Sequence, residues 1–253
     1  LIVTNAHAIN EGTYPDLTVK NNDFFFLPRR YDREIADTVV ELCSTRLPRA
    51  YGKATEGGIQ IITPSRKGEA GTENLNRRLQ SELNPPAKGK KELKFRETTF
   101  RVGDRVMQTK NNYDIEWIGK DGKEGTGVFN GDIGFITEID RADERFTISF
   151  DDGRCAVFDF SCFEDIEHAY AITVHKSQGS EYGAVIIPLY GVPSGLLSRN
   201  MLYTALTRAG KLAVLVGRTD IRHDMVENSQ KSVRYTDLKR LLIKTKQQNE
   251  KQI

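Results

Sequence analysis

Cysteine is scarce in this sequence of 253 residues. Its three cysteines, Cys43, Cys155 and Cys162, are an odd number and include no CxxC pair. Disulfide frameworks use an even set of cysteines, and zinc sites use closely spaced pairs. The sequence therefore suggests neither class, and we expect three buried thiols.

Long apolar runs and an excess of either charge are also missing. No run approaches the ~18 to 20 residues of a membrane span, and the first residues lack the basic start and cleavage site of a secretory signal. We therefore expect a cytoplasmic protein without membrane contact. The 37 basic and 35 acidic side chains leave a net charge of +2, too small to predict nucleic-acid binding by itself. Any anionic partner must be recognised locally.

The N-terminal part of the sequence alternates between strand and helix patterns. Short apolar or aromatic runs at 23–29 and 58–65 contain a proline near their ends and predict strands. Apolar residues recur at helical spacing over 31–47, and a second helix is predicted over 72–83. This order predicts a parallel sheet flanked by helices.

A connector rich in Pro, Gly and Lys at 84–94 separates this part from a different pattern. Beyond it, short alternating runs are divided by Gly, Asp and Asn, and Asp151–Gly153 predicts a hairpin turn. Residues 98–166 therefore predict a small antiparallel barrel. The α/β pattern then resumes, with strands near 168–173, 184–189 and 212–216 and a helix near 198–208.

The order of these patterns predicts an insertion, because neither α/β part alone has enough strands to form a covered sheet. We therefore predict an α/β fold with a parallel sheet, flanking helices and an inserted barrel. The predicted segments are the first α/β part at 1–97, the barrel at 98–166, the second α/β part at 167–230 and a C-terminal helix and tail at 231–253. Leu1 is not an initiator methionine, so we expect a piece of a longer protein.

A polar cluster, Thr173–Gly179, follows an apolar run in the second α/β part. In open parallel sheets, ligands bind outside the carboxyl ends of the strands. Hydroxyl, imidazole and amide groups suit contacts to phosphate and sugar, which fix register without reading sequence. The alternative is structural, with Thr173 and Ser177 capping the next helix and Gln178 tying down a loop.

A second cluster is the predicted helix that ends at Arg208. A basic side chain at a helix C-terminus is often only a favourable charge near the helix dipole. The alternative is an arginine finger, a guanidinium that stabilises the charge developing on a transferring phosphoryl group.

Both clusters resemble motifs of superfamily 1 DNA helicases. AYAITVHKSQGSEY resembles motif V and LYTALTRAGKLAVLVG resembles motif VI, in the form used by the RecD/TraA branch (exodeoxyribonuclease V alpha-like), whose polarity is 5′ to 3′. NAHAINEGTYP resembles the segment after motif III, and ITPSRKGEAGTENLNRRLQ resembles the motif IV region.

The resemblance extends from Leu1 to about Gly217 and includes the barrel. FRVGDRVMQTKNNYD and VFNGDIGFI resemble the entry to the inserted SH3-like barrel called 2B. The resemblance therefore implies the second RecA-like motor domain, 2A, which is P-loop NTPase-like but lacks the P-loop, together with its 2B insertion.

The resemblance also implies roles for individual residues. One set faces single-stranded DNA: Thr173, His175, Ser177, Lys110, Asn111 and Asn112. A second set faces ATP: Arg66, Gly179, Glu181 and Arg208, with Arg208 as the catalytic arginine. A third set couples the two sides: Gln178, Tyr203 and Thr204. For Arg66 an exposed loop arginine, and for residues 110–112 a simple turn, stay open as alternatives.

The sequence lacks the motifs that hold nucleotide and metal in such motors. A P-loop needs G-x-x-x-x-G-K-[ST], and every Gly-Lys pair here is followed by Ala, Lys, Asp, Glu or Leu. The Asp143–Glu144 pair falls in a polar turn and not after an apolar strand, so it is no Walker B motif. We therefore expect an upstream RecA-like domain 1 to hold ATP and Mg²⁺, and this chain alone to be inactive.

The predicted function is part of an ATP-dependent 5′ to 3′ helicase that translocates on single-stranded DNA and unwinds duplex at single-strand junctions, in repair or recombination. RecBC-like partner subunits stay an open question. The alternatives are the helicase region of a TraA-like conjugative relaxase, a non-catalytic DNA-binding module, and a barrel that docks proteins. Arg208 argues against a pure binding module, which has no use for a γ-phosphate contact.

Overall fold

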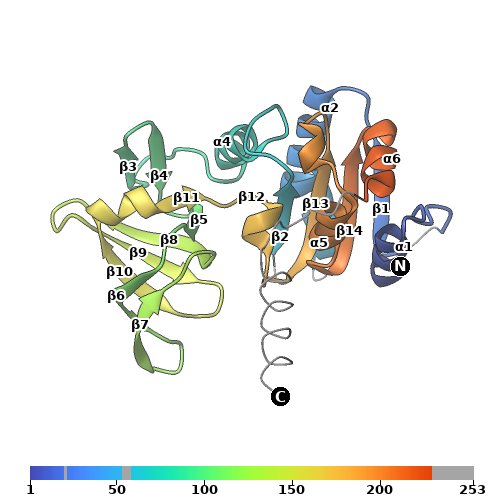
Figure 1. Cartoon of the computed structure of the whole chain (residues 1–253). Coiled ribbons are helices and arrows are strands. Elements are labelled where there is room, and N and C mark those ends of the chain that lie inside the picture. The colour runs from blue at the N-terminus through green and yellow to red at the C-terminus, as the bar shows by residue number, and fades with distance from the viewer. Residues whose placement is uncertain (20–21, 53–57, 230–253) are drawn as a thin grey trace, which may run out of the picture.

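The computed structural model describes residues 1–19, 22–52 and 58–229 (Figure 1). The C-terminal helix and tail predicted at 231–253 lie outside the described residues. The elements of the α/β part are α1 (Ile2–Glu11), β1 (Phe24–Pro28), α2 (Asp32–Glu41), the π-helical turn η1 (Leu42–Arg46), α3 (Leu47–Tyr51), β2 (Ile59–Thr63), α4 (Thr72–Leu83), β12 (Ala171–Thr173), the 3-10 turns η4 (Val174–Ser177) and η5 (Ser194–Leu196), β13 (Tyr182–Leu189), α5 (Arg199–Leu206), β14 (Ala209–Gly217) and α6 (Thr219–Glu227).

Five strands form one parallel sheet in the order β1-β14-β13-β2-β12. Strands from before and after the barrel are interleaved in this order, since β14 and β13 lie between β1 and β2, and β2 lies between β13 and β12. Neither half of the chain could therefore build the sheet alone. The predicted α/β fold with an insertion is confirmed.

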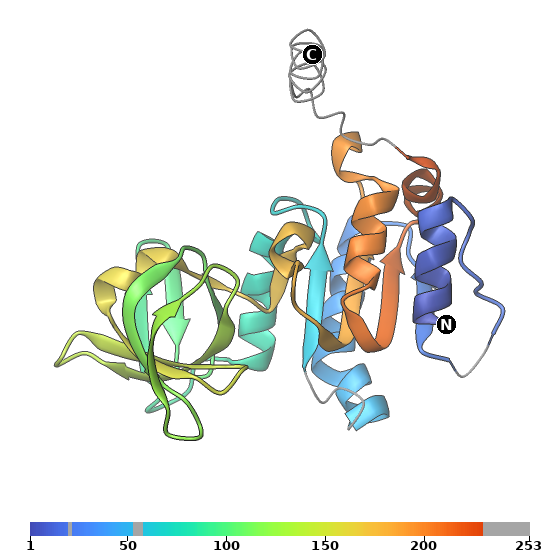
Figure 2. The same cartoon turned by 60° about the horizontal axis from the view of Figure 1, so that its bottom comes forward.

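Helices cover both faces of the sheet, and each face has its own apolar core. Helices α1, α5 and α6 pack on one face, where α1 and α5 lie side by side (Figure 2). Helices α2, α3 and α4 pack on the other face, where Leu75 and Leu79 of α4 are fully buried. Burying one such side chain stabilises the fold by about 2 kcal/mol. All eight residues of β13 are buried, as expected for a central parallel strand.

The inserted barrel has seven antiparallel strands in the order β11-β5-β8-β9-β10-β6-β7, beside a separate hairpin of β3 and β4. Its core contains Phe146, Phe158 and Phe163, with ring centroids 5.1 Å apart for Phe146–Phe158 and 3.8 Å apart for Phe146–Phe163. The turn at Asp151–Gly153 joins β9 to β10, as predicted. The elements are β3 (Glu92–Phe95), β4 (Thr98–Arg101), β5 (Arg105–Gln108), β6 (Asn112–Ile118), β7 (Glu124–Val128), β8 (Ile133–Asp140), β9 (Arg145–Phe150), β10 (Cys155–Asp159), the 3-10 turn η3 (Phe160–Asp165) and β11 (Ile166–His168).

The single strand predicted near 168–173 is wrong in one respect. Residues up to His168 pair with β5 in the barrel, while Ala171–Thr173 pair with β2 in the parallel sheet. Ala169 and Tyr170 make the crossing between the two sheets, because one short strand cannot satisfy two sheets that lie apart. The domain limits given from the sequence stay a prediction.

The prediction of three buried thiols is also only partly right. Cys43 is buried, and burial raises the pKa of its thiol to about 11. Cys162 is half-buried, and Cys155 is exposed because it lies on the outward side of β10, whose residues alternate between exposed and buried. No helix in the described ranges is long and apolar enough to cross a membrane.

Asp104 joins the barrel to the sheet. Its side chain is fully buried between β4 and β5. Its carboxylate has five polar partners at 2.6–3.0 Å: Gln80, Asn84, the Arg101 amide, His168 and Tyr170. Burial by itself raises the pKa of this carboxyl group, but the His168 and Asn84 contacts outweigh it and hold the pKa below its ordinary value. The barrel is therefore anchored to α4 and to the strand crossing.

Candidate functional site

The motif V segment runs from the carboxyl ends of the parallel strands, here called the carboxyl edge of the sheet, to their amino ends, called the amino edge. It begins at Thr173, which pairs with Thr63 at the carboxyl end of β2, and it reaches β13 near the amino end of β2, where Ala184 pairs with Ile59. The η4 turn and residues 178–181 make this passage. The two ends of the polar cluster therefore lie at opposite edges of the sheet.

Arg208 lies at the amino edge and is hydrogen-bonded to the end of the motif V segment. Its Nη1 atom donates to the carbonyl oxygen of Ser180 at 3.0 Å. Its Nε and Nη2 atoms donate to the Thr204 carbonyl at 3.3 Å and to the Thr207 hydroxyl at 3.2 Å. In return, the amide of Tyr182 donates to the Arg208 carbonyl at 2.9 Å. Motifs V and VI are thus joined at this edge.

The guanidinium of Arg208 is half-buried, and its charge is not neutralised by a carboxylate among the described residues. Its hydrogen-bond acceptors are two carbonyls and a hydroxyl. By contrast, Arg105 and Arg154 in the barrel are both paired with aspartates at 2.6 Å. Arg208 therefore retains a positive charge that an anionic ligand can meet.

Gly179 and Glu181 flank Ser180, whose carbonyl oxygen accepts the hydrogen bond from Arg208. Gly179 has a φ of +88°, and no atom other than those of its chain neighbours lies within 4 Å of the position that a β-carbon would take. Glu181 is exposed, and its carboxylate lies so close to Gly210 that a β-carbon there would be 2.6 Å from Oε1. The structure thus brings together three of the four residues predicted to face nucleotide.

Helix α5 supports Arg208 through its last turn. Ser198 caps the helix, accepting a hydrogen bond from the Met201 amide. Thr204 supplies the carbonyl that Arg208 binds, and its own hydroxyl donates to the Asn200 carbonyl at 2.7 Å. Tyr203 packs near His7 of α1 with ring centroids 6.5 Å apart. The coupling role of Tyr203, Thr204 and Gln178 stays a prediction, and Gln178 is exposed between the two edges.

The carboxyl edge holds the residues predicted to face DNA, but they do not all point outward. His175 is exposed and Thr173 is half-buried. Ser177 is fully buried, and its hydroxyl donates to the Val174 carbonyl at 2.8 Å. Thr173 precedes η4 without a side-chain capping bond, so the capping alternative is not realised there. In this position the Ser177 hydroxyl stabilises the η4 turn through its hydrogen bond to Val174.

Arg66 is also at the carboxyl edge, in the loop after β2. Its guanidinium pairs with Glu167 at 3.2 Å and with Glu73 at 3.7 Å. Arg208 lies at the amino edge, so the structure does not bring these two arginines together. The exposed loop arginine, left open from the sequence, fits this geometry better.

The barrel junction places the predicted residues 110–112 in a well-bonded turn. Lys110 pairs with Asp165 at 2.6 Å, and this contact raises the pKa of Lys110. Asn111 accepts a hydrogen bond from the Asn130 amide at 2.9 Å, and Asn112 accepts one from the Asp114 amide at 3.1 Å. Lys110 and Asn111 are nevertheless exposed beside the motif V loop, where Lys176 donates to the Asn130 side chain at 2.5 Å.

Comparisons with known proteins agree with this arrangement. Residues 75–150 match the family described as the ATP-dependent RecD-like DNA helicase SH3 domain, and residues 168–216 match the UvrD-like helicase C-terminal domain. The chain is 39% identical over 153 residues to the ATP-dependent RecD2 DNA helicase of Deinococcus radiodurans, covering 60% of this chain and 19% of that protein. The chain is a relative of the RecD-like DNA helicases.

Further similarities support the same family. The RecBCD enzyme subunit RecD of Mycolicibacterium smegmatis is 29% identical over 187 residues, covering 72% of this chain and 29% of that protein. A crystal structure of Pif1 helicase from Bacteroides, in complex with ADP-AlF3 and single-stranded DNA, has the same fold, with a TM-score of 0.50, 19% identity and coverage of 95% of this chain and 53% of that one. The superfamily 1 resemblance is confirmed. The chain spans less than a third of the length of each of the two RecD relatives named here.

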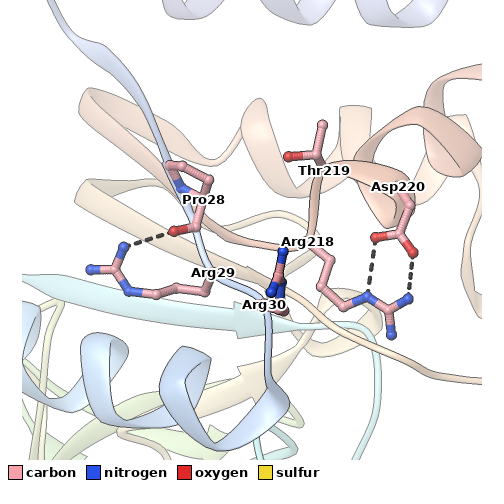
Figure 3. A pocket seen from close by; sticks show the side chains of 6 residues that line it. All are labelled: Pro28, Arg29, Arg30, Arg218, Thr219 and Asp220. Atoms are coloured by element: carbon pink, nitrogen blue, oxygen red, sulfur yellow. Dashed lines mark hydrogen bonds and ion pairs between the residues drawn. The ribbon is translucent and has the colours of Figure 1, made fainter.

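The RecD-like chain also has basic residues at the carboxyl edge that sequence reasoning missed. A pocket of 480 Å³ at the ends of β1 and β14 is lined by Arg29, Arg30 and Arg218, with Pro28, Thr219 and Asp220 (Figure 3). Arg218 pairs with Asp220, and Arg29 donates to the Pro28 carbonyl at 2.8 Å. The signal was the arginine pair that directly follows the FFFLP strand, at the position where parallel sheets bind ligands.

Within the described ranges, no group of three or more His, Cys, Asp or Glu side chains could hold a metal ion. The chemistry that this part of the chain offers is a guanidinium at one edge and hydrogen-bonding and basic groups at the other.

Proposed function

We propose that this chain is the second motor domain, with its SH3-like insertion, of an ATP-dependent DNA helicase that moves 5′ to 3′ on single-stranded DNA and unwinds duplex. The observation that carries the proposal is Arg208, which has no carboxylate partner in the described structure and is bonded to the motif V segment. A guanidinium in this state suits a phosphoryl group that gains charge in its transition state. The RecD-like family supports the same activity.

Nucleotide would bind at the amino edge, against a first RecA-like domain that lies upstream. That domain would hold Mg²⁺ and most of the phosphate contacts, since this sequence has no P-loop. On this side, Arg208 faces the γ-phosphate, the open backbone at Gly179 admits close approach, and the exposed Glu181 carboxylate suits sugar hydroxyls. Hydrolysis of ATP supplies the free energy. These three residues position the nucleotide and stabilise its charge.

Single-stranded DNA would lie along the carboxyl edge, from the motif V turn to the barrel. Thr173 and His175 contribute hydrogen-bonding groups, and Lys110, Asn111 and Asn112 extend the surface onto the barrel. Such contacts to phosphate and sugar are indifferent to base sequence, as translocation requires. Arg66 can join this surface only by releasing Glu167 and Glu73.

The hydrogen bond from Arg208 to Ser180 couples the two edges. When the guanidinium turns toward a phosphate, Ser180 loses its donor and the segment from Gln178 back to Thr173 is free to shift. The grip on the strand at the carboxyl edge therefore changes with the state of the amino edge. Tyr203 and Thr204 hold the helix from which Arg208 acts.

We place the complete protein in the cytoplasm, acting in DNA repair or recombination at junctions of duplex and single strand. The relatives named RecD2 and RecD favour a helicase over a TraA-like relaxase or a non-catalytic binding module. The RecBCD name of one relative makes RecBC-like partner subunits a further proposal for this protein.

The test is unwinding by the complete polypeptide that contains this chain. Forked DNA with only a 5′ tail is compared with a fork that has only a 3′ tail, each with ATP and with a non-hydrolysable analogue. We expect strand separation only from the 5′ tail and only with ATP. Unwinding from the 3′ tail alone would contradict the polarity, and ATP-independent separation would contradict the motor.

A further inference from the structure

Two aromatic rings lie exposed on the barrel beside the motif V loop. Tyr113 near the start of β6 is 66% exposed, and Phe129 directly after β7 is 41% exposed. Their ring centroids are 5.8 Å apart in an edge-to-face arrangement. Single exposed apolar residues are common on protein surfaces, but two large rings in contact form a small apolar patch that folding has not covered.

The position of the Phe129 ring is fixed by its neighbours. Gly127 has a φ of +96°, and a β-carbon there would lie 3.1 Å from Cζ of Phe129, so the glycine gives the ring room to pack over β7. The Phe129 amide donates to Asp132 at 2.9 Å, and Asp132 is in turn held by Arg154 at 2.6 Å. The ring is therefore displayed from a rigid turn.

A chain of hydrogen bonds joins this pair to the loop that follows β12. Lys176 of η4 donates to the Asn130 side chain at 2.5 Å, and the Asn130 amide donates to Asn111 at 2.9 Å. Asn111 then donates to the hydroxyl of Tyr113 at 3.3 Å. The aromatic pair thus has a defined place relative to the motif V turn.

Apolar packing beneath this polar chain fixes the same junction. Met107 and Ile133 of the barrel belong to one buried cluster with Ile172 of β12 and Val174 of η4. The barrel cannot turn at this point without breaking that cluster. The pair and the carboxyl end of β12 therefore move as one surface.

We propose that Tyr113 and Phe129 form a stacking platform for the bases of single-stranded DNA. This inference rests on the proposed function, and it adds base stacking to the backbone grip at the motif V loop. Every base has a π face, so stacking on aromatic rings binds a strand without selecting its sequence. The amino group of Lys176 and the exposed His175 lie on the loop side, where a strand's phosphates would run.

The charge and size of the patch favour a nucleic acid over a protein partner. Stable protein interfaces bury roughly 800 Å² on each side and have a broad apolar centre. Here two rings adjoin polar asparagines and the loop that carries Lys176, and no other aromatic pair of the barrel lies at its exposed surface within the described residues. Aromatic rings beside a basic side chain are the pattern of single-strand binding surfaces.

The test compares intact and abasic strands in the complete polypeptide. Binding of a fluorescent oligo(dT) strand and of the same strand with a run of abasic sites is measured by anisotropy, for the wild type and for Tyr113→Ala/Phe129→Ala. We expect the double variant to bind oligo(dT) at least about tenfold more weakly, and the wild type to lose a similar factor on the abasic strand. The double variant should bind the abasic strand almost as well as it binds oligo(dT), because it has already lost the stacking that the abasic sites remove.

Two matched variants accompany this measurement. Ile118→Ala removes an exposed apolar side chain at the far end of β6 and should leave strand binding unchanged. The exchange Tyr113→Phe/Phe129→Tyr keeps both rings and should keep the affinity within about threefold, since stacking depends on the ring face.

Three results would overturn the inference. Oligo(dT) affinity of the alanine variant equal to that of the wild type would show that the rings make no contact. If the fold-losses in affinity from the alanine variant and from the abasic strand multiply when the two are combined, the rings act on something other than the bases. Failure of the wild type to bind either strand would refute the proposed function itself, and the platform with it.

Discussion

Arg208 and Ser180 are joined by a hydrogen bond of 3.0 Å between the Nη1 atom and the carbonyl oxygen. The next residues reinforce this link, because the Tyr182 amide donates to the Arg208 carbonyl at 2.9 Å. The arginine proposed to meet a phosphate is therefore held by the segment proposed to grip the strand. Any change that displaces Ser180 should reach Arg208.

Gly179 offers the mildest such change. Its φ of +88° is a conformation in which alanine is unfavourable by roughly 1–2 kcal/mol, although open space leaves no steric clash. We expect Gly179→Ala to lower DNA-stimulated ATP hydrolysis of the complete protein by about tenfold. Gly179→Asn should lose less, since asparagine enters the left-handed region more readily.

The control for this series is Gly195→Ala, because Gly195 has neither a positive φ nor a neighbour within 4 Å of its β-carbon position. It should hydrolyse ATP like the wild type. Equal rates for the alanine and asparagine variants at position 179 would refute the conformational argument.

Lys176 should contribute a phosphate contact at the carboxyl edge. Its amino group donates to Asn130 and has no carboxylate partner among the described residues. Each phosphate that a single-strand-binding protein neutralises adds about 0.7 to the slope of log affinity against log salt concentration. We expect Lys176→Ala to weaken strand binding and to reduce this slope by about 0.7, measured by titration at several salt concentrations.

Lys123→Ala is the matched control, since Lys123 is 81% exposed and pairs with Asp121 in the turn between β6 and β7. Its slope should equal that of the wild type. A normal slope for Lys176→Ala would remove Lys176 from the strand-binding surface.

Asp104 should stabilise the junction between barrel and sheet in a pH-dependent way. Its pKa is lowered in the folded chain, so its contribution is complete above the unfolded pKa of about 4 and is lost as the pH falls further, through the lower folded pKa. We expect Asp104→Asn to reduce the free energy of unfolding by about 3 kcal/mol near pH 7, because buried donors lose a charged acceptor. Urea unfolding followed by circular dichroism measures this.

The same experiment below pH 4 separates this account from a simple packing defect. The wild type should lose its advantage over Asp104→Asn as the pH falls. A difference that stays constant from pH 7 down to pH 2 would show that the carboxylate charge is not responsible.

Much of the fold follows from local patterns in the sequence. The continuous apolar run at 182–189 is typical of a strand buried on both faces, and β13 is that strand. The switch from helical spacing to short alternating runs predicts the barrel, because side chains alternate along a strand with period two. The position of Arg208 at the end of a helix follows from the same reading, and the structure has it there.

Side-chain directions and distant pairings could not be predicted in this way. Val174 and Ser177 are three residues apart in a 3-10 turn, so they share one side, and burial of Val174 takes Ser177 inward with it. Tyr113 meets Phe129 because Asn112 pairs with Val128 across an irregular register, which no local pattern specifies. The family motifs predicted that both Arg66 and Arg208 face ATP, but the topology of the sheet places them at opposite edges.

The chain by itself should not hydrolyse ATP. It has the guanidinium but no P-loop, and an arginine finger accelerates transfer only when the nucleotide is held elsewhere. We expect phosphate release from the purified 253-residue chain at the level of buffer alone, with and without DNA. Turnover well above that level would mean that the chain contains a nucleotide site of another kind.

The measurement that tests the central claim most directly is ATP hydrolysis by the complete protein with Arg208→Ala, alongside strand binding by the same variant. We expect hydrolysis to fall by about 10³- to 10⁵-fold while the affinity for single-stranded DNA stays near that of the wild type. Arg208→Lys should not restore the rate, because a point charge does not replace a planar fork. The control Arg145→Ala, on an exposed arginine of β9, should hydrolyse ATP normally. Hydrolysis by Arg208→Ala at the wild-type rate would contradict the account.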